Sequence, residues 1–239
     1  AALLRDDLLG RLAHRFAAAT RDGDTATARW AAMALVRLQF ASPNAPADAD
    51  VIARATAVLV TLLQDDQADA EQRLCGALAI AVLPQCRAPE GIVRASSGPT
   101  AGGATSVDCV TLWAQALPAV LGLQDADRAR PLLQLIGRSH APRALTPLLA
   151  LLDNVLSRAD IVAALGTLGQ AGAIPALGGR LREDPYVHVR VAAATALGAL
   201  SGQYAGARAA LVAASKTERE PAVQAAIRSA LPPRPPAKP

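Results

Sequence analysis

The chain has 239 residues, of which 52% are hydrophobic and 3% aromatic, and its formal net charge is +4. This apolar content is enough for a sizeable core and excludes disorder of the whole chain. The apolar residues are mostly alanine and leucine, which favours packed helices over a sandwich or barrel built from β-branched and aromatic residues. No uninterrupted apolar run is as long as a membrane helix requires, so we expect a soluble protein without a membrane span.

The start of the chain leaves its compartment open. A first residue of Ala1 is compatible with removal of an initiator methionine, with cleavage of an export signal and with trimming of the chain. The three cysteines are odd in number and lack metal-ligand spacing, which favours a reducing compartment. We therefore expect the protein in the cytoplasm, with a periplasmic or exported location as the alternative.

Residues 1–83 predict two degenerate helix pairs. Apolar residues recur there at three- and four-residue steps, as on one face of a helix. The expected helices span residues 3–19, 25–40, 51–63 and 69–83.

Residues 84–106 predict an irregular insertion. The segment from Ser96 to Gly103 has the composition of turns and linkers, and long loops of this kind are usually functional or disordered. Cys86 and Cys109 flank the insertion, and a disulfide between them would close it at its base. Free, buried thiols are the alternative, and both interpretations stay open at this point.

Residues 107–231 predict four further helix pairs, the first from segments 107–121 and 127–137. The repeat is most regular over residues 143–202, where Ala164-Leu165-Gly166 returns 32 residues later as Ala196-Leu197-Gly198. A period of this size is typical of a helical solenoid. Residues 232–239 form a proline-rich tail, which cannot continue a helix.

The regular region resembles HEAT repeats, in particular the short bacterial type also found in phycobilisome lyases. The resemblance rests on Asp184, Val189, Arg190, Ala193 and the two motifs Ala173-Ile174-Pro175-Ala176-Leu177 and Ala196-Leu197-Gly198. It is closest over residues 143–202, weaker to 231 and poor before 128. It implies an all-α, right-handed solenoid of about six helix pairs, forming one domain over residues 1–231, with a concave face lined by second helices.

The resemblance also implies a structural ladder between successive repeats, made of Asp153 and Asp184 with Arg158 and Arg190. An aspartate before the second helix can accept its unpaired N–H groups, and a neighbouring arginine can reach that carboxylate with two N–H groups. Gln224 replaces the arginine in the last unit, where we expect the ladder to break.

No catalytic, cofactor or metal site is predicted. The histidines His14, His140 and His188 are far apart in the sequence and match no metal-binding motif, and the chain has neither a nucleophile elbow nor a phosphate-binding loop. The adjacent acids Glu183-Asp184 and Asp65-Asp66 are interpreted as solvated turn residues. Trp30 and Trp113, among apolar residues at helical spacing, are interpreted as core residues.

Charge is distributed unevenly along the chain. Residues 1–127 hold 10 arginines and 14 acidic residues, a net charge of −4, whereas residues 128–239 hold 14 basic and 6 acidic residues, a net charge of +8. The basic half could attract nucleic acid through a surface formed by five arginines, namely Arg143, Arg180, Arg182, Arg208 and Arg228. That hypothesis expects these arginines on one face, with exposed aromatic residues to stack on bases.

The sequence thus supports three hypotheses about function. The first is a non-catalytic scaffold that docks a protein partner on the concave face, as part of a larger assembly. The second is nucleic-acid binding by the basic half. The third, from family analogy alone, is a phycobilin-lyase-like chaperone or lyase subunit.

Overall fold

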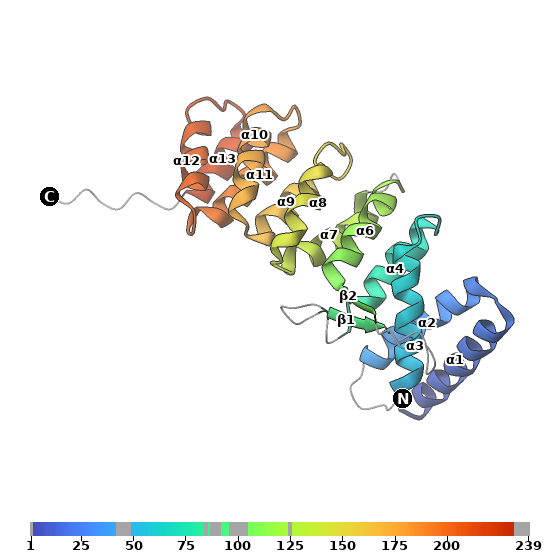
Figure 1. Ribbon diagram of the computed structural model, residues 1–239. Coiled ribbons are helices and arrows are strands. Elements are labelled where there is room, and N and C mark those ends of the chain that lie inside the picture. The colour runs from blue at the N-terminus through green and yellow to red at the C-terminus, as the bar shows by residue number, and fades with distance from the viewer. Residues whose placement is uncertain are drawn as a thin grey trace. The chain divides into compact units, whose positions relative to one another are not determined.

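A computed structural model describes residues 2–41, 49–83, 86, 92–95, 105–123 and 126–231 of the chain. Within these residues, helices follow one another as antiparallel pairs (Figure 1), and the prediction of an all-α architecture is confirmed apart from one small hairpin. The proline-rich tail lies outside the described residues. Among the described helices, none is both long and apolar enough to cross a bilayer.

The first three helix pairs match the expected segments closely. They are α1 (Ala2–Asp22) with α2 (Thr25–Ala41), α3 (Ala49–Gln64) with α4 (Ala70–Ile80), and α6 (Cys109–Leu121) with α7 (Ala126–Arg138). In each pair we call the earlier helix the first helix and the later one the second helix.

The last three pairs are equally clear. They are α8 (Leu145–Ala150) with α9 (Arg158–Leu168), α10 (Ile174–Glu183) with α11 (Val187–Ser201), and α12 (Ala205–Ala214) with α13 (Pro221–Ala230). Two short 3-10 helices, Pro142–Ala144 and Ala171–Ala173, precede α8 and α10. Proline in the first turn starts α10 and α13, where its missing N–H is not needed. Gly169, with φ of 79°, ends α9 in the left-handed conformation.

The chain divides into two compact units, residues 1–132 and 133–239, and the division falls inside α7. That residues 1–231 form one continuous solenoid domain therefore stays a prediction.

A β-hairpin occupies part of the predicted insertion. Strand β1 (Ile92–Ala95) pairs antiparallel with β2 (Thr105–Asp108), so that Ile92 lies opposite Asp108. The prediction that residues 84–106 are irregular is wrong for these strands, and the third pair begins at Cys109 rather than Val107. The β-branched residues of these short segments favour extended backbone, a signal that the glycine-rich composition between them obscured. Residues 84, 85, 87–91 and 96–104 lie outside the described residues.

The glycine of the repeated Ala-Leu-Gly motif sets how closely the second helices of residues 133–239 approach. Helix α11 packs against both α9 and α13 (Figure 1). A Cβ atom on Gly166 would lie 2.6 Å from the Cβ of Ala196, and one on Gly198 would lie 2.7 Å from the Cβ of Ala230. Any side chain at these two positions would force neighbouring second helices apart.

The two tryptophans have different environments. Trp113 is 3% exposed, and its Nε1 donates a hydrogen bond of 3.2 Å to the carbonyl of Ala77, which confirms the prediction of a core residue. Trp30 is 49% exposed, so the same prediction is wrong for Trp30. Helical spacing among apolar neighbours did not distinguish the two, because contacts in the tertiary structure decide which apolar side chains of a helix are covered.

Candidate functional site

A buried arginine links the fourth helix pair to the fifth. Arg158, in the first turn of α9, donates from Nε to the carbonyl of Leu152 at 2.8 Å and from Nη2 to the carbonyl of Asp153 at 3.3 Å. Its Nη1 donates to Oδ2 of Asp184 at 3.1 Å, in the turn of the next pair. The side chains of Arg158 and Asp184 are 9% and 0% exposed. The arginine therefore supplies carbonyl bonds within its own turn and an ion pair to the following one.

The same arrangement recurs one pair later. Arg190 in α11 donates from Nη1 to the carbonyl of Asp184 and from Nε to Oε2 of Glu218, both at 3.0 Å. In the last pair Gln224 donates from Nε2 to the carbonyl of Glu218 at 2.8 Å. We call the positions of Arg158, Arg190 and Gln224 the ladder position.

Several details differ from the expected ladder. Glu218 takes the place of an aspartate in the last turn. Gln224 keeps the contact to a backbone carbonyl, so the last pair is still part of the ladder and forms its end. The carboxylate of Asp153 is 92% exposed and lies 2.7 Å from Arg180, which is not a ladder arginine.

Asp184 is wholly buried, so its interpretation as a solvated turn acid is wrong. It accepts from the N–H of Tyr186 in the turn, and α11 starts without a side-chain cap.

The ladder also occurs in residues 1–132, where the sequence did not indicate it. Arg29, in the first turns of α2, donates to Oδ2 of Asp65 at 2.7 Å, in the turn between α3 and α4. This hydrogen bond, more than any other contact, holds the pKa of the Asp65 carboxyl below its ordinary value. Arg73 in α4 is buried and donates to the carbonyls of Leu63 and Gln115. These residues were missed because Asp65 and Arg73 are eight positions apart, whereas Asp153 and Arg158 are five apart.

Burial supports this alignment of the ladder positions. The residue seven positions after each ladder arginine is a fully or almost fully buried aliphatic residue. These residues are Val36, Ile80, Leu165 and Leu197. In the third pair, counting back from Gly137 as the counterpart of Gly166 and Gly198 puts Ala129 at the ladder position. The ladder is therefore interrupted in α7, the helix in which the chain divides into its two units.

The positions one and five residues after the ladder position are half-buried or exposed on every second helix that carries it. We call them the outer positions. In α9, α11 and α13 they hold small or medium side chains, namely Ala159, Ala163, Val191, Thr195, Ala225 and Ser229. In α2 and α4 they hold Trp30, Ala34, Leu74 and Leu78. The second helices of residues 1–132 therefore present a bulkier apolar surface than those of residues 133–239.

In a comparison with protein-family models, residues 143–232 match HEAT repeats. We call residues 143–232 the HEAT repeats. The match confirms the resemblance for this part of the chain, and the narrower resemblance to phycobilisome lyases has no support from it. No curated protein matches the chain.

Within the HEAT repeats, the arginines of the expected basic surface are divided between both helix layers. Arg143, Arg180, Arg182 and Arg208 belong to the first-helix layer, whereas Arg228 lies in the last turn of α13. Arg180 is bound to the carboxylates of Asp153 and Asp184, and Arg182 lies 3.7 Å from Glu183. Four of the five arginines thus share one layer, two of them beside carboxylates, and binding of nucleic acid stays a prediction.

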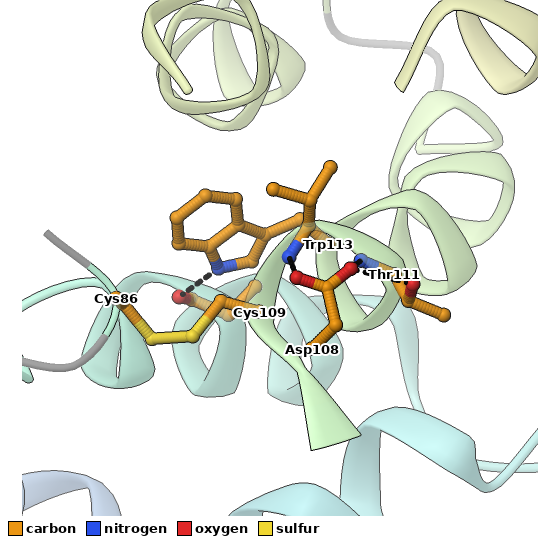
Figure 2. Close-up of a disulfide and its surroundings, with 7 residues drawn as sticks. Cys86, Asp108, Cys109, Thr111 and Trp113 are labelled. Atoms are coloured by element: carbon orange, nitrogen blue, oxygen red, sulfur yellow. Dashed lines mark hydrogen bonds between the residues drawn. A yellow bond between two sulfur atoms is a disulfide. The ribbon is translucent and has the colours of Figure 1, made fainter. Parts of the chain in front are cut away.

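Outside the HEAT repeats, Cys86 and Cys109 form a disulfide in the structure, with their Cα atoms 5.7 Å apart (Figure 2). Cys109 directly follows β2 and opens α6, where Asp108 accepts hydrogen bonds from the N–H groups of Val110 and Thr111. The bond therefore joins the two ends of the segment that contains the hairpin. Cys75 is the free cysteine, and it is half-buried in α4.

The disulfide in solution is a prediction that thiol counting tests. After denaturation without reductant, we expect one reactive thiol per chain, from Cys75, and three after reduction. A Cys75→Ser variant is the control and should give none and two. Three thiols in the unreduced wild type would show that the alternative, free cysteines, holds.

Glu218 makes the last HEAT repeat sensitive to acid. Burial raises the pKa of its carboxyl, but hydrogen bonds from the N–H of Glu220, from Arg190 and from the N–H of Arg219 outweigh burial and hold that pKa below its ordinary value of 4.5. A carboxyl whose pKa is lower in the folded state stabilises the fold above the unfolded pKa, and this contribution disappears as pH falls through the folded pKa. We expect wild type to be more stable than Glu218→Gln at pH 7, with the difference shrinking below about pH 4.5. Urea titrations from pH 7 to pH 3 measure it, and a difference that is constant with pH would contradict it.

Among the described residues, no group of three or more histidine, cysteine, aspartate or glutamate side chains is placed to hold a metal ion. The buried charged groups of the HEAT repeats are engaged with one another and with backbone carbonyls, which is the pattern of a structural network.

Proposed function

We propose that this protein is a non-catalytic scaffold that binds a protein partner on the face formed by its second helices. HEAT repeats commonly form protein-interaction scaffolds. Second helices line the concave side of such solenoids, which offers an extended surface to a partner.

One observation carries the choice of face. Trp30 occupies an outer position of α2 and is 49% exposed. Tryptophan side chains in folded proteins are, on average, highly buried. Leu74 and Leu78 occupy outer positions of α4, which packs against α2. A large aromatic side chain among aliphatic neighbours is the kind of residue that dominates binding at protein interfaces. These three residues therefore form the proposed anchor of the partner.

Affinity capture with purified variants tests the proposal. We expect Trp30→Ala to weaken a partner captured by the wild type at least tenfold, because truncation of an interface hot spot costs about 2 kcal/mol or more. The thermal midpoint should change little, since half of the side chain is already in contact with water. Val212→Ala is the matched control, because Val212 is a large apolar residue, 40% exposed, on the first helix α12. A partner that binds Trp30→Ala as well as wild type, or that is lost with Val212→Ala, would place the interface elsewhere.

A further inference from the structure

A cavity of about 540 Å³ opens between the first three helices, and Arg29 is the one ladder arginine among its described lining residues. Phe16 and Ala19 of α1, Ala28 of α2, and Val58 and Leu62 of α3 supply apolar parts of its lining. Helix α2 packs against both α1 and α3, so it holds the two first helices on either side of the cavity. In the HEAT repeats the corresponding first helices α10 and α12 pack directly on each other.

Three arginines complete the lining, and none of the described lining residues is acidic. Arg29 is bound to Asp65 in the ladder. Arg54 pairs with Asp50, which is not a lining residue, but both side chains are exposed, at 45% and 65%. Exposed ion pairs of this kind are weak and compete poorly with a better anion. Arg21 is exposed, and its Nε donates to the carbonyl of Ala17. The cavity thus combines an apolar lining with cationic groups that reach solvent.

The size of the cavity favours a small ligand over a partner helix. Its lining on α3 runs from Arg54 to Leu62, about 12 Å along the helix axis. A docked helix is held by anchors at i, i+3 or i+4, and i+7, and the flanking turns would extend beyond this length. The volume lies within the range of about 300–1,000 Å³ that small-molecule sites occupy.

We propose that this cavity binds a small anionic amphiphile, with its apolar chain against α1, α2 and α3 and its carboxylate on Arg54 or Arg21. The apolar walls desolvate the chain, and a guanidinium group can bind a carboxylate through two parallel hydrogen bonds. This site is separate from the outer positions of the second helices, so the proposal does not depend on the partner-binding function.

Calorimetric titration of the full chain with decanoate, below its micellar concentration, tests the proposal. We expect saturable binding of one decanoate per chain and at least tenfold weaker binding of decanol, which has the same chain without the charge. Ala57→Phe, which places a ring in the lining, should abolish binding. The double variant Arg21→Gln/Arg54→Gln should weaken it at least tenfold and keeps the test decisive if Ala57→Phe fails to fold.

Arg11→Gln is the matched control, because Arg11 is an exposed arginine of α1 that pairs with Asp7 and does not line the cavity. It should bind decanoate as the wild type does. No saturable binding, equal binding of decanol, or binding that survives both cavity variants would overturn the proposal. Sedimentation that shows a dimer dissociated by Ala57→Phe would also overturn it, since a second copy of the chain would then fill the cavity.

Discussion

Replacing Arg158 by methionine is expected to lower the free energy of unfolding by about 3–5 kcal/mol, the usual cost of removing one partner of a buried ion pair. Methionine keeps much of the side-chain volume, so the loss reports on charge and hydrogen bonds rather than on a cavity. Asp184, wholly buried, keeps the hydrogen bond from the N–H of Tyr186 and a single, longer contact to a positive charge, Nη1 of Arg180, 3.7 Å from its Oδ2. The carbonyls of Leu152 and Asp153 also lose their donor. Urea unfolding followed by far-UV circular dichroism measures the change.

Arg182→Met is the matched control for Arg158→Met. Arg182 is more than half exposed and lies 3.7 Å from the exposed Glu183, so its loss should change stability by less than about 1 kcal/mol. The double variant Arg158→Met/Asp184→Leu should recover part of the stability, because an apolar pair often replaces a buried ion pair without loss. A cost below 1 kcal/mol for Arg158→Met, or no recovery in the double variant, would show that the ladder is not a coupled, buried network.

Replacing Gly166 by alanine is expected to destabilise the HEAT repeats, although alanine is the better helix former. The new Cβ would lie 2.6 Å from the Cβ and 2.8 Å from the Cα of Ala196 on the neighbouring helix. Neither atom belongs to a flexible side chain, so α9 and α11 must move apart. Overpacking of this kind costs about 1–3 kcal/mol, and the helix-propensity gain of alanine offsets up to about 1 kcal/mol of it. We expect a net loss on the order of 1–2 kcal/mol from these opposing effects.

Gly179→Ala supplies the control for Gly166→Ala. Gly179 lies within α10, and a Cβ built there meets no atom within 4 Å. The higher helix propensity of alanine is then the only effect and should stabilise the protein by about 0.5–1 kcal/mol. Urea unfolding of both variants should therefore give changes of opposite sign. Stabilisation by both substitutions would show that the close approach of α9 and α11 relaxes without cost.

The regular repeats were predictable from sequence because their residues recur at fixed spacing. The period shared by Ala164-Leu165-Gly166 and Ala196-Leu197-Gly198 identified the helix pairs, and the resemblance placed Arg158 and Arg190 at positions where the structure engages both. The sequence alone identifies the glycine of that motif only as part of a repeat. Its physical role, permitting contact at Ala196 and Ala230, required the neighbouring helix to be present.

Sequence spacing did not identify ladder residues where the turn between two helices differs in length from the turns of the regular repeats. Arg29, Asp65 and Arg73 take part in the same kind of contact as Arg158 and Asp184, but no fixed period relates them. Glu218 was missed for a different reason, since a longer acid reaches the same arginine as an aspartate would. The contact depends on where the carboxylate lies, and turns of different length can bring it to the same place.

The sequence by itself determined the helix pairs, their order and the regular region, because local periodicity and turn residues act over a few positions of the chain. The tertiary structure decided which polar residues are buried and which apolar residues are exposed. Asp184 is buried beside Arg158, which reaches it from the preceding pair, whereas Trp30 is 49% exposed although its neighbour Ala31 on α2 is buried. Both depend on residues far apart in the chain, and packing between helices, rather than local pattern, sets them.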